Sequence, residues 1–315
     1  MDVIIVCHTE FGKVYDKIVV AEKSAVSGVS AGVSNLIKLA DKYSAKISFA
    51  VCPEVIPYFP KNINHEIGIH IHPGWQEFEI KKHKFFVGDK WLKENCKQSS
   101  NSTVLKDFSY SEQSDMIKKG KEYLTAELGT KPKFFVAGRW SLNNDTIKAL
   151  VASGFTHDCS APSHSISDHY NWSKLPRICM PYKPNEKDYQ EKGNMPFLIV
   201  PISQTLLGGT VNPEGVITYG LGWLKSCFSE YYKQNVPLFH ICLHSPSMAD
   251  NFYISIMDKF LSFISERGSV NFKFVSEIKE YPRKKFRANV APYFLGANGD
   301  LAKTFLKRIT HVRDK

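Results

Sequence analysis

Short apolar runs alternate along the chain with longer stretches of helical periodicity. The apolar runs have the length of strands, which favours buried strands of a parallel sheet. We predict strands at residues 2–7, 46–52, 67–72, 133–136, from 154, 197–202, 238–243 and 271–275. Between them apolar positions recur at helical spacing, which predicts helices at residues 24–43, 111–128, 143–150, 219–234 and 250–266.

Local signals mark the ends of two of these helices. Ser111 is a plausible N-cap of the helix over 111–128, and Gly129 stands where a left-handed residue commonly ends a helix. Asn143 or Asn144 is expected to cap the next helix along the chain, because asparagine favours that position.

Strands separated by helices are typical of a parallel β/α series. No G-x-G-x-x-G or G-x-x-x-x-G-K-[ST] motif follows a strand, which argues against an open nucleotide-binding sheet. We therefore expect an α/β fold, a distorted (β/α) barrel of about seven or eight strands, as a single domain over residues 1–282. Residues 283–315 are a basic C-terminal extension whose apolar residues indicate a helix packed on the barrel.

Two connections are too long for plain loops. Both follow predicted strands, so we expect them to cover the rim formed by the carboxyl ends of the strands. Residues 73–110 carry the aromatic side chains Trp75, Phe78, Phe85, Phe86 and Trp91, and residues 159–195 carry Tyr170, Trp172, Tyr182 and Tyr189. Such rings suit stacking against sugars, and they equally suit hydrophobic clusters that hold the loops in place.

The bulk composition is that of an ordinary globular protein. The 315 residues are 43% hydrophobic and 23% charged, and no apolar run approaches the ~20 residues that span a bilayer. The chain passes from Met1 directly into an apolar strand without a basic leader, so we expect a cytoplasmic protein. Seven scattered cysteines without a C-x-x-C pair argue against disulfides or a zinc cluster, and Cys52 is interpreted as a small core residue.

The formal net charge of +10 is concentrated at one end of the chain. Residues 283–315 contain nine Lys/Arg and two Asp, a net charge of +7, which leaves about +3 for residues 1–282. We expect no nucleic-acid partner, because no binding motif accompanies this charge. The basic extension is interpreted as a solvated helix face, with peripheral contact to an anionic membrane surface or a lipid-linked glycan as the alternative.

Polar side chains able to do chemistry stand at the ends of several predicted strands. His70 and His72 are two residues apart, so in a strand they point to the same face. His8 and Glu10 follow the first strand, and His244 ends the seventh. The carboxyl ends of parallel strands share one rim, and neutral imidazole is a common ligand of divalent transition metals. These residues therefore predict a metal site at that rim.

The chain resembles the polysaccharide deacetylase superfamily, the NodB-homology carbohydrate esterases, in four segments: I-V-C-H-T-E-F-G, H-E-I-G-I-H-I-H-P-G-W, the stretch from Phe134 to Ser160, and I-C-L-H-S-P. It looks most similar to the branch found with O-antigen and capsule biosynthesis. The resemblance covers roughly residues 2–280. It implies a distorted (β/α) barrel, a divalent metal that is usually zinc, and hydrolysis of an N- or O-acetyl group on a sugar.

The resemblance also implies a set of metal ligands. Glu10 takes the place of the family's metal-binding acid, and His70 that of its first metal-binding histidine. The second histidine usually follows four residues after the first, where this chain has Gly74, so His72 is the nearby replacement. A shell of one carboxylate and two imidazoles with an open position is normal for catalytic zinc.

Three further residues take catalytic roles by the same resemblance. His8 stands where the family has its aspartate base, and His244 matches the histidine that acts as general acid. The arginine that steadies the base falls at Val136, and Arg139 is its substitute three residues later. Imidazole has an ordinary pKa near 6.5, so His8 is chemically able to act as a base toward water.

Other assignments stay open from the sequence. His8, His70 and His72 could instead bind the metal, with Glu10 as the base. A non-catalytic carbohydrate-binding relative is a second possibility, because the usual base and the second histidine position differ. Another barrel amidohydrolase with a His-x-His site is a third. That class places the pair on its first strand, whereas here the pair follows two earlier strands.

The expected substrate is an N-acetylated or otherwise acylated sugar, on a nucleotide or lipid carrier, used in surface polysaccharide biosynthesis. We expect Trp75, Trp140, Asp158 and Ser160 to contact it. Asp158 alternatively caps a loop. The expected cofactor is a divalent metal, Zn²⁺ above others.

Overall fold

Eight parallel strands form the central sheet in the part of the chain that the structure describes. The computed structural model describes residues 1–80, 83–206, 209–282 and 284–288. The strands follow one another in the order β10 (Leu198–Ile199), β9 (His157–Asp158), β8 (Phe134–Ala137), β5 (Glu66–Ile71), β4 (Ile47–Val51), β1 (Asp2–Thr9) and β11 (Leu238–His244), and β12 (Asn271–Phe272) pairs with the start of β1. All pairs in this sheet are parallel, so the carboxyl ends of the strands form one rim.

The two edges of the sheet are bonded to each other. Beyond β10, the backbone N–H of Ser203 donates to the carbonyl of His240 in β11 at 3.2 Å. The N–H of Cys242 donates to the carbonyl of Val211 at 3.1 Å. These bonds join the segment after β10 to the opposite edge strand, and they complete an irregular ring. The predicted distorted barrel is confirmed.

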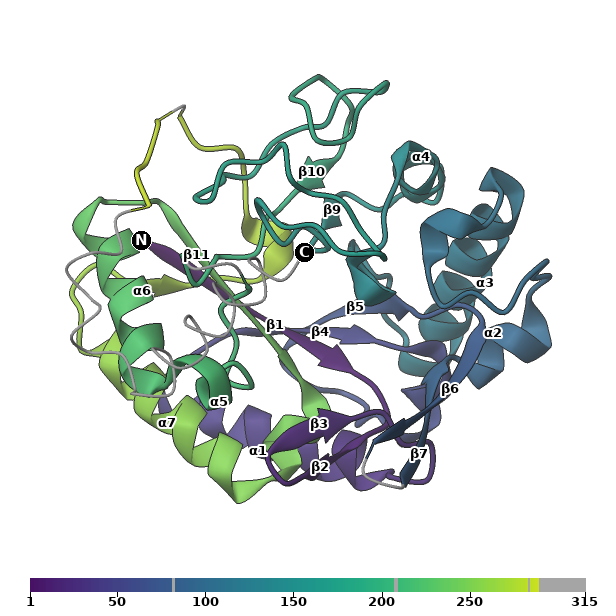
Figure 1. The fold of residues 1–315 in the computed structure, drawn as a ribbon, viewed down its shortest axis with the longest axis horizontal. Helices are drawn as coiled ribbons and strands as arrows, with labels where there is room; N and C mark the ends of the chain where they lie inside the picture. Colours follow the sequence, from purple (N-terminus) through teal and green to yellow (C-terminus); the bar gives the residue numbers. More distant parts are fainter. Residues whose placement is uncertain (81–82, 207–208, 283, 289–315) are drawn as a thin grey trace, which may run out of the picture.

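Helices cover the outside of this ring. Figure 1 shows α6, α7 and α1 along the left and lower part of the view and α4, α3 and α2 along the right, around the outside of the curved sheet. The helices are α1 (Ser27–Lys42), α2 (Lys90–Asn95), α3 (Tyr110–Leu128), α4 (Asn144–Ala152), α5 (Val216–Tyr219), α6 (Leu221–Lys233) and α7 (Asn251–Ser265). The short 3₁₀ turns are η1 (Pro53–Tyr58), η2 (Leu105–Asp107), η3 (Gly138–Trp140), η4 (Ser245–Ala249) and η5 (Val275–Glu277).

Two antiparallel hairpins stand apart from the central sheet. One joins β2 (Lys13–Tyr15) to β3 (Ile18–Val20), and the other joins β6 (Trp75–Ile80) to β7 (His83–Gly88). Figure 1 shows both at the end toward which β1 points. The hairpins therefore flank the rim where the polar strand ends meet.

The strands separate two apolar layers because successive side chains point to opposite faces. In β1, Val3 and Ile5 pack with the helices, whereas Ile4 and Val6 belong to a second buried cluster drawn from the inner faces of the strands. The alternation continues to the end of the strand. His8 therefore points inward, at the top of the inner cluster.

Most of the predicted elements are present with altered bounds. The helix predicted over 219–234 is present as α6, and Gly220, with a positive φ of 82°, separates it from the short α5 before it. The strand predicted from residue 154 begins at His157, and the strand predicted over 197–202 is reduced to β10. The long connection 73–110 contains β6, β7, α2 and η2, which its aromatic content did not reveal.

The prediction of Ser111 as a helix cap is wrong. Ser109 caps α3: its hydroxyl accepts the backbone N–H of Glu112, whose carboxylate accepts the N–H of Ser109 in return. This reciprocal pair satisfies two N–H groups that the helix itself leaves free. Gly129 at the other end is left-handed, with φ of 67°, and Asn143 caps α4, so both of those predictions are confirmed.

The predicted helical extension over 283–315 lies outside the described residues, apart from 284–288. Within that short piece Phe286 packs against the outer core. Across the described ranges no helix combines the length and the apolar character needed to cross a bilayer.

The capping arrangement can be tested by two serine substitutions. We expect Ser109→Ala to lower the free energy of unfolding by about 1 kcal/mol, because it removes the acceptor for a helix N–H. Ser111→Ala, two residues on and also exposed, is the matched control and should change stability by less than about 0.5 kcal/mol. Urea denaturation followed by circular dichroism measures both. Equal effects from the two variants would contradict the capping assignment.

Candidate active site

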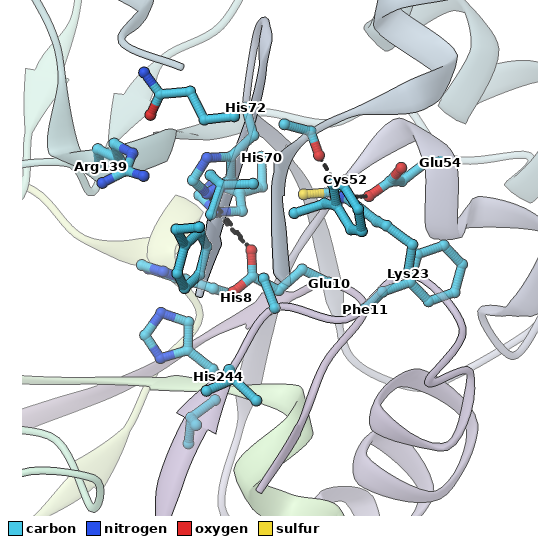
Figure 2. A pocket seen from close by; sticks show the side chains of 18 of the residues that line it. His8, Glu10, Phe11, Lys23, Cys52, Glu54, His70, His72, Arg139 and His244 are labelled. Carbon is cyan, nitrogen blue, oxygen red and sulfur yellow. Dashed lines mark hydrogen bonds and ion pairs between the residues drawn. The ribbon is translucent and has the colours of Figure 1, made fainter. Parts of the chain in front are cut away.

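A cavity of about 720 Å³ opens at the carboxyl ends of the strands. His8 and Glu10 reach it from the end of β1, and His70 and His72 from the end of β5. His244 reaches it from the end of β11 (Figure 2). Parallel strands bring these side chains to one rim, as their positions in the sequence predict.

The register of the sheet sets which histidines meet. His8 in β1 is the direct partner of His244 in β11, and their ring centroids lie 4.9 Å apart. The rings of His8 and His70 lie 4.8 Å apart, and those of His70 and His72 lie 4.6 Å apart. Four imidazoles from three strands therefore form one continuous cluster.

Glu10 is the carboxylate at the centre of this cluster. Its Oε2 lies 3.5 Å from Nε2 of His72 and 4.0 Å from Nε2 of His70. The backbone N–H of Glu10 donates to Ser245 Oγ at 3.3 Å, which ties the end of β1 to η4. Burial raises the pKa of Glu10, and the positive charges of His244 and Lys23 oppose that rise.

His70 is held in the form that binds metals. Its Nδ1 lies 2.9 Å from the carbonyl of Val136 and must donate, since a carbonyl oxygen only accepts. Nε2 therefore keeps its lone pair, and it is buried without a hydrogen-bond partner in the described part of the chain. Burial lowers the pKa of His70 to about 4, so the ring is neutral at physiological pH. A neutral imidazole oriented through its second nitrogen is the usual metal-ligating arrangement.

His72 is oriented by a glycine. A Cβ on Gly138 would lie 2.4 Å from Nδ1 of His72, so the imidazole occupies the space that any larger residue would need. Nε2, at the other end of the ring, is the atom that faces Glu10. Burial, followed by the influence of His70, lowers the pKa of His72 well below its ordinary value.

Cys52 joins the same cluster from the end of β4. The ligand atoms of Glu10, Cys52 and His70 all lie within 4.8 Å of one another. The interpretation of Cys52 as a small core residue missed this position, although its place at a strand end could have indicated it. Burial raises the pKa of the Cys52 thiol, and Glu10 adds to the effect, so a cation is required to favour the thiolate.

The donor set fits a divalent transition metal. Glu10 offers a carboxylate, His70 and His72 offer neutral imidazoles, and Cys52 offers sulfur. The buried Nε2 atom of His70 would otherwise lose a hydrogen bond to water without compensation. Oxygen, nitrogen and sulfur donors at such spacing are the ligands that zinc takes in proteins.

His244 carries a positive charge on the other side of the cluster. Oε1 of Glu214 accepts the backbone N–H of His244 at 2.9 Å and lies 3.5 Å from its Nδ1. Burial works against the charged ring, but Glu214 outweighs it through its hydrogen bond and charge, and the pKa of His244 rises to about 9. Glu214 is not predicted by the sequence pattern, because it lies between β10 and α5, away from any strand end.

His8 is uncharged by contrast. Its Nε2 is buried without a hydrogen-bond partner among the described residues. Burial lowers the pKa of His8 well below its ordinary value, and the neighbouring His70 and His244 add to this. The cavity thus holds one imidazole able to accept a proton next to one able to give a proton.

Arg139 lines the cavity from η3, directly after β8. Its Nη1 lies 2.9 Å from Nε2 of His169, a residue of the long connection 159–195. This contact is to His169 and not to the proposed base. The expected role of Arg139 in steadying a base therefore stays a prediction. Trp140 follows it and also lines the cavity.

Three predicted substrate contacts lie elsewhere. The carboxylate of Asp158 is buried and accepts the N–H of Ser160 at 2.9 Å and its hydroxyl at 2.5 Å. Ser160 Oγ also accepts the N–H of Ala137 at 2.7 Å. Trp75 stacks on Phe86, with ring centroids 5.3 Å apart. None of Asp158, Ser160 and Trp75 is among the described residues that line the cavity. Substrate contact by these three stays a prediction without geometric support.

Four aromatic side chains of the described residues line the cavity. Phe78 and Phe86 come from neighbouring strands of the β6–β7 hairpin, Phe11 follows β1, and Trp140 lies in η3. Phe86 also stacks on Trp75. Aromatic rings from the connection 73–110 were expected at the rim, and the hairpin decides which of them reach the cavity.

The fold is shared with solved structures of low sequence identity. A protein from Mycobacterium smegmatis assigned as a polysaccharide deacetylase has a TM-score of 0.56 at 15% identity, over 91% of this chain and 93% of that one. A similarly assigned protein from Pseudomonas aeruginosa PAO1 has a TM-score of 0.53 at 15% identity, and PuuE allantoinase has 0.53 at 14%, each over 88% of both chains. No family model matches the sequence, and no curated protein does. Likeness at this level shows the fold.

The His244–Glu214 pair makes the stability of the protein depend on pH. The pKa of His244 is higher in the folded protein, about 9, than its ordinary 6.5. The contribution of the pair to the free energy of unfolding is therefore complete below pH 6.5 and is lost as the pH rises through 9. We expect Glu214→Gln to remove about 2 kcal/mol of stability at pH 6, with the partial exposure of the ring allowed for, and much less at pH 10.

Denaturation at several pH values, with NMR titration of the histidine ring signals, measures this dependence. Glu230→Gln is a control on a buried acid of α6, away from the cavity. It is expected to leave the titration of His244 unchanged. An ordinary His244 pKa in the wild-type protein would contradict the pairing.

Proposed function

We propose that the protein is a metal-dependent hydrolase that removes an acetyl or similar acyl group from a sugar. One observation carries the proposal. Glu10 faces the neutral imidazoles of His70 and His72, while the charged His244–Glu214 pair lies in the same cavity (Figure 2). Hydrolysis of an amide or ester needs an electrophile for the carbonyl, a base for water and an acid for the leaving group, and this cavity offers residues for each.

Glu10, His70 and His72 would hold the divalent cation, with Cys52 as an additional sulfur donor. When bound, such a cation supplies Lewis-acid polarisation of the acyl carbonyl. The protein contributes the orientation of the donors: Val136 holds the ring of His70, and Gly138 leaves room for the ring of His72.

Proton transfers fall to the two remaining histidines. His8 is neutral and its Nε2 has no hydrogen-bond partner in the described chain, so it can take the proton of the attacking water. His244 is protonated beside Glu214, so it can give a proton to the leaving nitrogen or oxygen of the sugar. The carbon–nitrogen or carbon–oxygen bond breaks, and the carboxylic acid and the deacylated sugar leave.

The proposed setting is the biosynthesis of a surface polysaccharide such as O-antigen or capsule. The substrate would be a nucleotide- or lipid-linked sugar, acted on in the cytoplasm. The resemblance of the four sequence segments to that branch of the deacetylases supports this setting. The fold shared with two proteins assigned as polysaccharide deacetylases agrees with it.

The metal site can be tested with the purified protein. We expect about one equivalent of zinc per chain in the wild-type protein and acetate release from N-acetylated sugars. His70→Ala should remove most of the zinc and lower the rate at least ~100-fold, because it deletes a ligand. His164→Ala, which replaces an exposed histidine, is the control that should retain both.

Zinc content is read by atomic emission spectroscopy and acetate by a coupled assay. Unchanged zinc in His70→Ala would show that the proposed ligand set is wrong. Zinc binding and sugar binding without acetate release would instead favour a non-catalytic carbohydrate-binding relative.

A second pair of variants separates the two ligand assignments left open by the sequence. We expect Glu10→Gln to weaken zinc binding at least 10-fold, because a carboxylate ligand is lost. His8→Ala should keep the zinc and lose acetate release, because the base is removed without touching the ligands. Isothermal titration with zinc gives the first quantity independently of activity. The reverse outcome, zinc lost in His8→Ala and kept in Glu10→Gln, would assign His8 as ligand and Glu10 as base.

A further inference from the structure

The charged side chains that line the cavity are paired, with one exception. Lys23 bonds to Glu54 and to the carbonyl of Gly88. Glu77 pairs with Lys84 at 2.7 Å, and the pairing of His244 with Glu214 has been described. Glu10 faces the imidazoles. This leaves a single cation of the described cavity lining without a salt bridge to an acidic side chain.

That cation is Arg139. The contact that its guanidinium makes is to His169, whose pKa is lowered by burial and then by Arg139 itself, so the imidazole is a neutral acceptor. Nε of Arg139 is buried, and no described residue accepts its hydrogen bond. The charge of Glu10 favours the charged guanidinium, but no carboxylate of the described chain forms a salt bridge with it. A half-buried guanidinium with an unsatisfied Nε–H is costly, and an anion that enters the cavity would relieve that cost.

A second free donor lies beside it. Nε1 of Trp140 is buried and has no acceptor in the described chain, although Trp140 also lines the cavity. The two residues share one turn, and both are left-handed, each with φ of 52°. A left-handed backbone is rare for residues other than glycine. Two in succession indicate that the turn serves to direct the side chains of Arg139 and Trp140.

The turn is fixed from outside the cavity. Nε1 of Trp172 donates to the carbonyl of Trp140 at 3.1 Å, and the N–H of Ser141 donates to the carbonyl of Gly138 at 3.1 Å. Both free donors are therefore held in place before any substrate arrives. Figure 2 shows Arg139 next to His72, on the far side of the cavity from His244.

We propose that Arg139 and Trp140 bind an anionic group of the substrate, so that the protein selects an acylated sugar carrying a carboxylate or a phosphate. Nε–H and Nη–H of arginine form a planar pair that matches the two oxygens of such a group. The indole N–H supplies a further donor. The selection of an acidic sugar rests on the proposed deacylase function, but the binding of the anion can be measured without it.

The test compares three sugars that differ in charge: N-acetylglucosamine, N-acetylglucosaminuronic acid and N-acetylglucosamine 1-phosphate. We expect kcat/KM of the wild-type protein to be at least ~10-fold higher for one of the acidic sugars than for the neutral one. Whether the uronic acid or the phosphate is preferred identifies the anion. Arg139→Gln should lower kcat/KM for that acidic sugar ~10- to 100-fold more than for the neutral sugar.

Further variants keep the result interpretable. Trp140→Phe preserves the ring and removes the N–H, so a smaller loss of ~3- to 10-fold confined to the acidic sugar is expected. Arg267→Gln replaces an exposed arginine after α7 and is the matched control, with kinetics unchanged for all three sugars. Titration calorimetry with glucosamine 1-phosphate and glucosaminuronic acid measures the same preference as a Kd.

The outcomes separate this inference from the proposed function. Equal kcat/KM for neutral and acidic sugars in the wild-type protein would overturn the inference and leave the deacylase intact. Equal losses for all sugars in Arg139→Gln would also overturn it, because Arg139 would then act on the reacting acyl group. If no sugar releases acetate but Arg139→Gln still weakens binding of the acidic sugar ~10-fold, the proposed function fails and the anion site stands.

Discussion

Burial of three imidazoles around one carboxylate is the constraint on which the rest of the site depends. His8, His70 and His72 are withdrawn from water, so each has a pKa well below its ordinary value and keeps a free lone pair. Glu10 can then face two of them without forming a fixed ion pair. The one protonated imidazole, His244, needs its own acid, Glu214, to hold its charge in the same surroundings. The neutral imidazoles and the protonated one are thereby separated within a single cavity.

The turn after β8 lies between the imidazole of His72 and the side chains of Arg139 and Trp140 that line the cavity. Gly138 lacks the Cβ that would collide with His72, so the ring can lie against the backbone. Arg139 and Trp140 follow at once in left-handed conformations, which turn their side chains into the same cavity. One short turn therefore sets the orientation of a candidate ligand and of two donors. The hydrogen bond from Nε1 of Trp172 to the carbonyl of Trp140 helps to keep the turn in that shape.

Much of the fold could be predicted from local pattern. Alternating apolar residues define the strands, and the polar residues at their ends indicate the rim, so His70, His72 and His244 were found with the barrel. The same reasoning fails where a residue makes its contacts outside its own element. Glu214 lies between strand and helix, and Cys52 looks like part of an apolar run. Asp158 has the sequence position of a site residue, yet its hydrogen bonds join it to Ser160.

The sequence by itself determined which side chains share a face, because alternation along a strand depends only on the local backbone. It also determined the candidate chemistry, a carboxylate and imidazoles at strand ends. The tertiary structure decided which of them meet. Distances such as the 3.5 Å between Glu10 and His72 depend on the register of separate strands and on the closure of the barrel. Burial, which sets the charge of every histidine in the cluster, exists only after those strands and the surrounding hairpins have assembled.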